Sequence, residues 1–169
     1  IVIVGGGVVG CETAHWLANE YGKNVTVLEM LPHFMMGVCT ANRGHLLHYL
    51  EKSGVRLYNC TKVKALAKDG VYVEQNQSQT VPDPYNTWQP LLPPNIPNPM
   101  EKAIKEEIVE KKIPADLIVL AMGGKADETF FFEAGEEHLA KEIYNIGDSS
   151  RAGRVLEAVR GAYHLAVRI

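Results

Sequence analysis

The apolar residues in the first third of the chain recur with two different periods. Short runs rich in β-branched residues at 1–4 and 25–28 predict buried strands. Apolar residues at helical spacing predict a helix over 8–21 and another over 40–53, which leads into a strand over 55–58. Three strands separated by two helices are typical of one mononucleotide-binding half of a doubly wound sheet.

The pattern changes after this half. Alternating residues at 62–66 and 70–74 flank Asp69-Gly70, which predicts a hairpin. Residues 100–112 fit both a helix and a strand, and we favour a strand that completes an antiparallel meander with the hairpin. A buried strand is expected over 115–122. The predicted fold class is therefore α/β, with a Rossmann-like, FAD/NAD(P)-binding parallel sheet and an antiparallel β-meander crossover.

Residues 76–99 form a Pro-rich arm, since they hold seven of the nine prolines, a density that excludes helices and central strands. The arm also carries aromatic and aliphatic residues, so we expect it to lie against its own domain or against a neighbouring domain or subunit. Beyond it we expect a short helix within 129–140 and a strand over 142–146. A final helix is predicted with one apolar face formed by Val155, Ala158, Val159, Ala162, Leu165 and Ala166.

The glycines after the first strand carry the strongest chemical signal. Residues 5–10 read Gly-Gly-Gly-Val-Val-Gly, with G-x-G-x-x-G spacing at Gly5, Gly7 and Gly10. In that order, such glycines allow a sharp turn, close approach of a diphosphate, and close helix–strand contact. The first amides of the following helix carry a partial positive charge of roughly half a unit, so they bind an anion without lysine or arginine. A glycine turn in an unrelated α/β protein is the alternative.

Glu29 ends the second strand, at the distance from the glycines where a dinucleotide site places an acid on the ribose hydroxyls. A carboxylate ~4 Å from a 2′-phosphate would cost about 4 kcal/mol per unit charge at an effective dielectric of ~20. Residues 30–34 offer no Lys or Arg to reverse this preference. We therefore predict NAD(H) rather than NADP(H), with a solvated strand-end acid as the alternative for Glu29.

Composition and charge limit the class of protein. The chain has 169 residues, 46% of them hydrophobic, which suits one domain or a domain and a fragment. A net charge of −3 gives no reason to expect nucleic acid or an anionic membrane surface as a partner. No apolar run approaches the ~18 residues of a membrane span. The chain begins inside a predicted strand and stops within a predicted helix, so we expect a piece of a longer protein. The odd, scattered cysteines lead us to expect that this protein is cytoplasmic.

The cysteines and histidines give weaker signals. Cys11, Cys39 and Cys60 form no C-x-x-C, which argues against a zinc site, an iron–sulfur site and a redox disulfide within this chain. We expect them to be reduced thiols that serve as small core residues. His45 and His48 lie three apart on the second predicted helix without a third ligand, so we expect a solvated or half-buried pair. No metal site is predicted.

Three further residues allow two interpretations each. Arg43, near the start of the second helix, could reach a phosphate or lie at the surface, and we favour the surface. Glu12 lies in the first turn of the first helix, where a negative charge is favourable without any ligand. Gly123 follows the buried strand over 115–122, where it suits either close approach of a ligand or a simple turn. No catalytic residue is predicted.

Four segments in order, 5–14, 25–31, 115–123 and 143–148, resemble successive motifs of the pyridine-nucleotide module of two-dinucleotide flavoproteins. The sequences of these segments are most similar to the C-terminal part of the NADH:flavin oxidoreductases related to 2,4-dienoyl-CoA reductase, enoate reductase and old yellow enzyme. The resemblance covers most of the chain.

The resemblance implies a larger enzyme, with an FMN barrel, a 4Fe-4S cluster, and an FAD domain into which the NADH domain is inserted. Hydride would pass from NADH to FAD, and electrons would pass through the cluster to FMN to reduce an unsaturated substrate. The expected domains are 1–140 for NAD(H), and 141–169 as a segment of the adjoining FAD-binding domain. The expected partners are the missing FAD and FMN-barrel domains, and a second copy in a homo-oligomer.

The resemblance also assigns site residues. The NADH contacts it implies are Gly5, Gly7, Val8, Val9, Gly10, Glu12, Glu29, Met30 and Gly123. Glu12 matches a family glutamate near the nicotinamide–flavin contact, and Val8 stands where disulfide-reductase relatives carry a gating tyrosine. Gly147 and Asp148 match the motif whose aspartate binds the FAD ribityl chain.

Two rival functions remain. No second G-x-G-x-x-G is present, so an FAD-binding half is missing from this chain. A non-catalytic module that holds ADP as a structural element, as in trimethylamine dehydrogenase, is one alternative. An ordinary single-domain dehydrogenase ranks last, because nothing in the chain resembles a catalytic Tyr/Lys or His/Asp pair.

Overall fold

The structure, a computed structural model, describes residues 1–88, 96, 98–99 and 102–169. The chain forms two compact units, Ile1–Met122 and Gly123–Ile169. This division falls inside the predicted NAD(H) domain of residues 1–140. The assignment of 141–169 to an FAD-binding domain stays a prediction.

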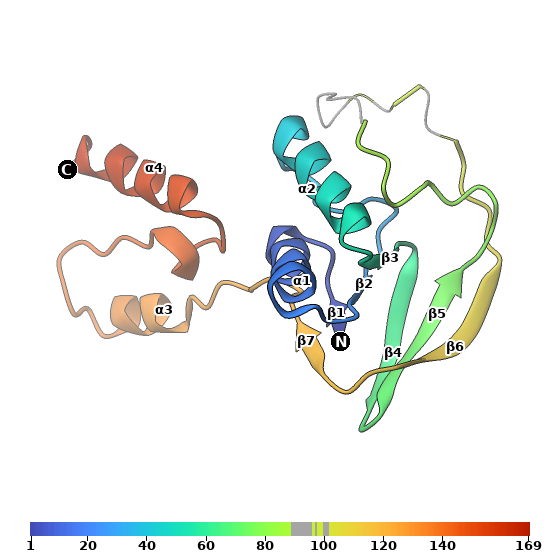
Figure 1. The fold of residues 1–169 in the computed structure, drawn as a ribbon. Coiled ribbons are helices and arrows are strands. Elements are labelled where there is room, and N and C mark those ends of the chain that lie inside the picture. Colours follow the sequence, from blue (N-terminus) through green and yellow to red (C-terminus); the bar gives the residue numbers. More distant parts are fainter. Residues whose placement is uncertain (89–95, 97, 100–101) are drawn as a thin grey trace. The chain divides into compact units, whose positions relative to one another are not determined.

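A four-stranded parallel sheet forms the centre of the first unit (Figure 1). Its strands are β1 (Val2–Val4), β2 (Thr26–Leu28), β3 (Arg56–Tyr58) and β7 (Ile118–Leu120). Each lies within a segment predicted as a strand, and their order is β3-β2-β1-β7. The prediction that the strand within 115–122 is buried is wrong: β7 is the outer strand of this sheet, and its Leu120 is 57% exposed. The last residue of β1 pairs with the last residues of β2 and β7, and β2 ends level with β3. The carboxyl ends of the four strands therefore lie along the same edge of the sheet, the edge that runs across the strands. The loops that follow these strands therefore meet at that edge.

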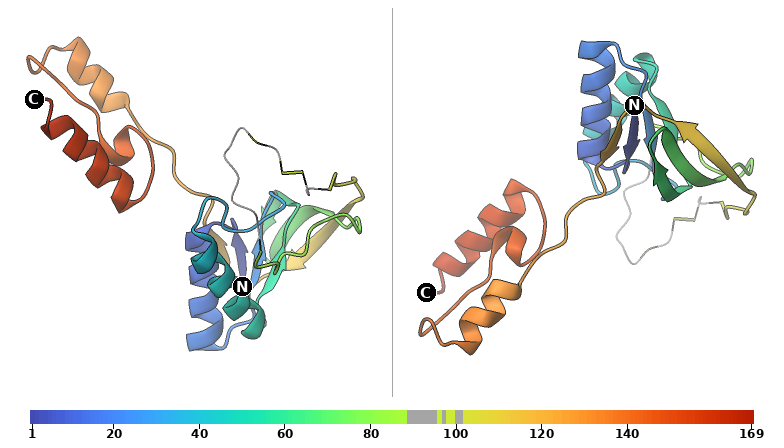
Figure 2. Two further views of the ribbon diagram at one scale, coloured as in Figure 1. Left: turned by 90° about the horizontal axis from the view of Figure 1, so that it is seen from above. Right: turned by 90° about the horizontal axis from the view of Figure 1, so that it is seen from below.

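Two helices, α1 (Val8–Tyr21) and α2 (Thr40–Lys52), cover one face of this sheet (Figure 2). Both form where helical spacing predicts them. The core on this side joins Ile3 of β1 to Ala14 of α1 and Leu47 of α2, and all three side chains are fully buried. On α2 the predicted apolar face forms this contact, through Leu47 and Leu50. On α1 the predicted face is wrong: Val9 and Trp16 are exposed, and smaller residues such as Cys11 and Ala14 face the sheet instead.

An antiparallel meander covers the other face of the sheet (Figure 2). It consists of β4 (Thr61–Ala67), β5 (Gly70–Asn76) and β6 (Ile108–Pro114). Val2 and Val4 point to this side, opposite to Ile3, and pack with Val71 and Val73 of β5. The meander links β3 to β7, which confirms the predicted fold class. Within the ambiguous segment 100–112 the strand interpretation is confirmed from Ile108 onward, and residues 100–101 lie outside the described part.

The described part of the Pro-rich arm lies against the outer side of the edge strand β3. The Tyr85 hydroxyl accepts a hydrogen bond from the Leu57 N–H (3.2 Å) and donates one to the Val55 carbonyl (2.5 Å). A side chain thus occupies backbone groups that an edge strand otherwise leaves unpaired. For this part of the arm, contact with its own domain is confirmed. Residues 89–95 and 97 lie outside the described part.

The second unit contains α3 (Thr129–Glu136), a short 3₁₀ helix η1 (Gly147–Ser149) and α4 (Val155–Ala166). Both predicted helices form, although the apolar face of α4 is exposed, with Val155 80% exposed. The predicted strand over 142–146 is wrong: these residues have no regular structure. A strand needs a hydrogen-bonded neighbour, and the described residues of this unit include no other strand. None of the helices in the described chain is both long and apolar enough for a membrane crossing.

The three cysteines differ in exposure, and the prediction that they are small core residues holds only in part. Cys11 is fully buried in the helix–sheet core, Cys60 is half-buried and Cys39 is exposed. Cys39 precedes α2 rather than lying on the buried face of an element, so periodicity could not place it.

Tyr85→Phe should lower the free energy of unfolding by about 1–3 kcal/mol, because two backbone groups of the β3 region lose their partner. Tyr72→Phe, at an exposed position of β5, is the matched control and should change it by less than about 0.5 kcal/mol. Urea denaturation of both variants measures the difference. Equal stability of the two would show that the Tyr85 hydroxyl does not hold the arm.

Candidate nucleotide-binding site

The turn between β1 and α1 makes contacts that only glycine permits. Gly5 has a φ of +111°, which L side chains rarely adopt, and a Cβ there would overlap the Ala121 carbonyl. A Cβ at Gly10 would overlap the carbonyl oxygen of Gly5, and one at Gly6 would overlap the Phe34 ring. These three glycines are required by the protein's own contacts, including Gly6, which the G-x-G-x-x-G spacing treats as variable.

Gly7 has a different environment. It is exposed, its φ is −72°, and an added Cβ would have no atom within 4 Å. It is also the N-cap residue of α1, and no side chain among the described residues caps that helix end. The first N–H groups of α1 therefore have neither intrahelical partners nor a side-chain cap. This open helix end fits the predicted approach of a diphosphate to the backbone.

The Glu29 carboxylate is held by two backbone amides. Its Oε2 accepts a hydrogen bond from the Gly6 N–H and its Oε1 accepts one from the Leu31 N–H, each at 2.8 Å. Glu29 is half-buried, so it is not a freely solvated strand-end acid. A carboxylate has about four lone-pair positions, so two remain available for ribose hydroxyls. Sequence reasoning missed this contact with the turn, which joins the ends of β1 and β2.

The carbonyl oxygen of Gly6 is held as firmly as its N–H. It accepts a hydrogen bond from the Met35 N–H at 2.8 Å and a weaker one from the Cys11 thiol at 3.5 Å. Burial raises the pKa of the Cys11 thiol to about 12, and the nearby Glu29 carboxylate adds to the rise. At neutral pH this thiol therefore stays protonated and acts as a donor rather than as a nucleophile.

Arg43 does not lie at the surface, and that prediction is wrong. Its side chain is 3% exposed, and it donates hydrogen bonds to the carbonyls of Phe34 (2.9 Å), Asn86 (3.0 Å) and Thr87 (3.5 Å). Burial lowers the pKa of its guanidinium, but arginine stays charged in proteins. Its burial depends on contacts with segments before and after α2 in the chain, which no local pattern in the sequence could reveal.

Apolar side chains surround the exposed end of the site. The residues after β2 and β7 and in the first turn of α1 remain exposed despite being apolar. They are Val9, Met30, Leu31, Met36 and Met122. Of these, Val9 and Met30 are predicted contacts, and Val8, also predicted, is half-buried at the start of α1.

The remaining polar candidates in the first unit lie on the two helices. Glu12 is exposed on α1. Its predicted place in the first turn is wrong, because α1 begins at Val8 and Glu12 is its fifth residue. His45 and His48 are exposed on α2, as predicted for a solvated pair, and their rings lie 4.6 and 5.7 Å from that of Tyr49. In the part of the chain that the structure describes, no group of three His, Cys, Asp or Glu residues could hold a metal ion.

The other predicted residues belong to the second unit. Gly123 is its first residue, with a φ of +84° that favours glycine. Gly147 opens η1 with a φ of +69°, and Asp148 accepts a hydrogen bond from the Gly153 N–H at 3.2 Å. The structure thus brings together Gly5, Gly7, Gly10 and Glu29. The roles predicted for Gly123, Gly147 and Asp148 stay predictions.

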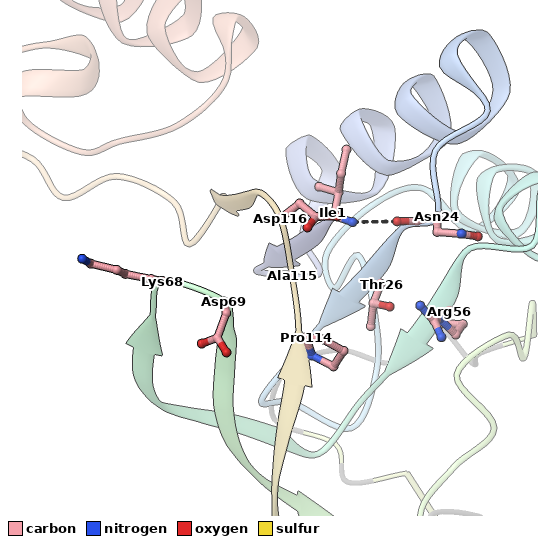
Figure 3. A pocket seen from close by; sticks show the side chains of 9 residues that line it. All are labelled: Ile1, Asn24, Thr26, Arg56, Lys68, Asp69, Pro114, Ala115 and Asp116. Carbon is pink, nitrogen blue, oxygen red and sulfur yellow. Dashed lines mark hydrogen bonds between the residues drawn. The ribbon is translucent and has the colours of Figure 1, made fainter.

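A separate depression of about 450 Å³ lies at the amino ends of β1 to β3, lined by residues that include Thr26, Arg56 and Asp116 (Figure 3). Open α/β sheets bind their ligands outside the carboxyl ends of the strands. The depression is at the opposite edge from the glycine turn, so it is not part of the candidate site.

A parallel sheet whose first strand leads through glycines into an open helix N-terminus, beside an acid at the end of the next strand, defines a dinucleotide-binding protein. The model of the family "Pyridine nucleotide-disulphide oxidoreductase" matches residues 1–144. The chain belongs to this family.

Curated relatives are similar over the whole chain. An NADH oxidase of Thermoanaerobacter brockii is 27% identical, and a cinnamate reductase of Clostridium sporogenes is 23% identical, each over 100% of this chain. Both alignments cover 21% of the relative. The chain therefore spans about a fifth of the length of these proteins.

Solved structures share the fold. A complex of 2-naphthoyl-CoA reductase with 2-naphthoyl-CoA has a TM-score of 0.71 and 25% identity, over 99% of this chain and 21% of that one. Histamine dehydrogenase from Rhizobium sp. 4-9 has a TM-score of 0.69 and 15% identity over 99% of this chain and 22% of that one, which shows the fold alone. This shared fold agrees with the membership of the chain in the pyridine nucleotide-disulphide oxidoreductase family.

Alanine at Gly10 should lower stability, whereas alanine at Gly7 should lower NADH affinity. Gly10→Ala should lower the free energy of unfolding by about 1–3 kcal/mol, because the new methyl group overlaps the Gly5 carbonyl. Gly7→Ala should change it by less than about 0.5 kcal/mol but weaken NADH binding about tenfold, because the methyl group enters the space left for the diphosphate. Thermal unfolding and calorimetric titration measure both quantities. Unchanged NADH affinity in Gly7→Ala would place the ligand elsewhere.

Proposed function

We propose that this chain binds NADH and positions its nicotinamide for hydride transfer to FAD, as one domain of a larger NADH:flavin oxidoreductase. In that enzyme the electrons continue to FMN and reduce an unsaturated substrate. The domain belongs to an oxidoreductase family, and the binding role is the step beyond that membership.

One observation carries the proposal: an uncapped helix end at Gly7 lies on the same sheet edge as the Glu29 carboxylate. The helix end attracts an anion, and the carboxylate accepts hydroxyl groups. A diphosphate joined to a ribose presents these two chemistries together. Exposed apolar side chains at Met30 and Leu31 offer a surface for the adenine ring.

The choice of NADH over NADPH rests on the charge and anchoring of Glu29. Two backbone hydrogen bonds hold the carboxylate in place, so it cannot swing away from a 2′-phosphate without losing both. Hydrogen bonds to a charged group are worth about 1.5–3 kcal/mol each. The next residues, Met30 and Leu31, carry no positive charge that would attract the phosphate.

When bound, the nicotinamide supplies the hydride and the flavin accepts it. The residues of this chain provide binding and orientation, and hydride transfer depends more on alignment than on proton transfer. We therefore assign no general acid or base to the chain. Val8, the first residue of α1, and Glu12, in its second turn, are our candidates for contacts near the nicotinamide.

The rest of the enzyme is proposed from the relatives. Their names include NADH oxidase and cinnamate reductase, and the chain covers about a fifth of their length. We propose that the partners of this chain are an FAD domain, held in part by Gly147 and Asp148, and an FMN barrel with a 4Fe-4S cluster. We place the enzyme in the cytoplasm, since the three cysteines of this chain are free thiols, as is usual for cytosolic proteins.

Glu29→Gln should weaken NADH binding about tenfold and narrow the preference for NADH over NADPH, because it removes the charge and one of the two acceptors. Glu20→Gln, at an exposed position near the end of α1, is the matched control and should change neither. Calorimetric titration of each protein with NADH, NADPH and ADP measures both effects.

Two outcomes would contradict the proposal. An unchanged ratio of NADH to NADPH affinity in Glu29→Gln would remove the argument for cofactor choice. Tight binding of ADP with no gain from the nicotinamide half would favour a static nucleotide-holding module.

A further inference from the structure

Arg43 is a buried cation that, among the described residues, donates its hydrogen bonds to backbone carbonyls. It is 3% exposed, and within the described residues no carboxylate forms an ion pair with it. Taking a guanidinium out of water is costly unless its donors are satisfied, and charge-assisted hydrogen bonds to several carbonyls provide that compensation. A buried charge in this position needs an explanation beyond filling space, because an aliphatic side chain would fill the same volume without desolvating a charge.

The first of its acceptors leads directly to the glycine turn. Arg43 Nε donates to the Phe34 carbonyl at 2.9 Å, and the fully buried Phe34 ring occupies the space that a side chain at Gly6 would need. The next residue, Met35, donates its N–H to the Gly6 carbonyl at 2.8 Å. Met35 has a φ of +52°, an uncommon conformation outside glycine that persists only where its surroundings hold it.

The other acceptors lie on the Pro-rich arm. Arg43 Nη1 donates to the carbonyl of Asn86 at 3.0 Å and to that of Thr87 at 3.5 Å. The arm is itself fixed one residue earlier, where the Tyr85 hydroxyl bonds to the backbone of Val55 and Leu57. Arg43 therefore connects a segment anchored on the edge of the sheet to a segment that contacts the turn.

We propose that Arg43 is a positioning residue for the dinucleotide site, holding the Phe34–Met35 segment so that the Gly6 peptide keeps the turn in its diphosphate-binding shape. This inference rests on the proposed function. Gly6 is the residue whose N–H binds Glu29 and whose carbonyl accepts from Met35, so the two peptide groups on either side of its Cα are both held. A shift of Met35 therefore alters the turn from one side while Glu29 holds it from the other.

The planar guanidinium suits this role better than an ammonium. It offers five donors in a fixed arrangement, so it can serve Phe34 on one side and the arm on the other. A lysine at this position would place one compact charge and could not satisfy both directions with the same geometry. Arg43→Lys should therefore still hold the Phe34–Met35 segment in part, whereas Arg43→Met should no longer hold it.

The test compares ADP with adenosine, because only ADP uses the diphosphate-binding turn. Calorimetric titration of the purified wild-type protein with each ligand gives the ratio of their affinities. The ratio of ADP affinity to adenosine affinity should fall about tenfold in Arg43→Met and by a smaller factor in Arg43→Lys. Arg56→Met, at an exposed position at the opposite edge of the sheet, is the matched control and should leave the ratio unchanged.

The ratio separates positioning from general stability. A purely structural role for Arg43 would lower the folded fraction and weaken ADP and adenosine equally, leaving the ratio constant. If Arg43→Met does not fold, Arg43→Lys decides the question by the same ratio. A constant ratio in the folded variant overturns the inference. A wild-type protein that binds ADP no more tightly than adenosine overturns the proposed function itself.

Discussion

The hydrogen bond between the Glu29 carboxylate and the Gly6 amide is the interaction on which the candidate site depends. It joins the loop after β2 to the loop after β1, and the second oxygen holds Leu31 in the same loop as Glu29. Because the strands end level, the two loops meet at one sheet edge. The same carboxylate therefore holds the turn in shape and, in the proposed function, also accepts the ribose hydroxyls. A substitution of Glu29 would thus change the local structure and the proposed binding contact together.

The glycines divide into two groups by what surrounds them. A side chain would overlap the protein's own backbone or Phe34 at Gly5, Gly6 and Gly10, whereas the space beside Gly7 is open. A turn closed on its inner side and open on its outer side directs the free amides of α1 outward. Close contact within the protein thus produces an exposed, positively polarised surface without a single basic residue.

Periodicity predicted the parallel strands, α1, α2 and the meander because each depends on which face of a local element is buried. It failed where the outcome depends on distant segments. The apolar residues of 142–146 suggest a strand, but the second unit as described provides no neighbour for one. The sequence predicts Arg43 at the surface, but the loop at Phe34 and the arm at Asn86 enclose it. The fingerprint located Glu29, yet its bond to Gly6 spans 23 residues and has no local signal.

The arm shows how a segment without regular structure still becomes part of a fold. Prolines keep it out of the sheet, and side chains supply the contacts that ladders of backbone hydrogen bonds supply elsewhere. Tyr85 bonds to the backbone at the edge of β3, and the Asn59 amide, just beyond that strand, donates to the carbonyls of Pro82 in the arm and Pro32 in the loop after β2. With Arg43, these bonds tie the arm to the loop that contacts the glycine turn. An edge strand that would otherwise expose its backbone is thereby covered by the segment that also steadies the candidate site.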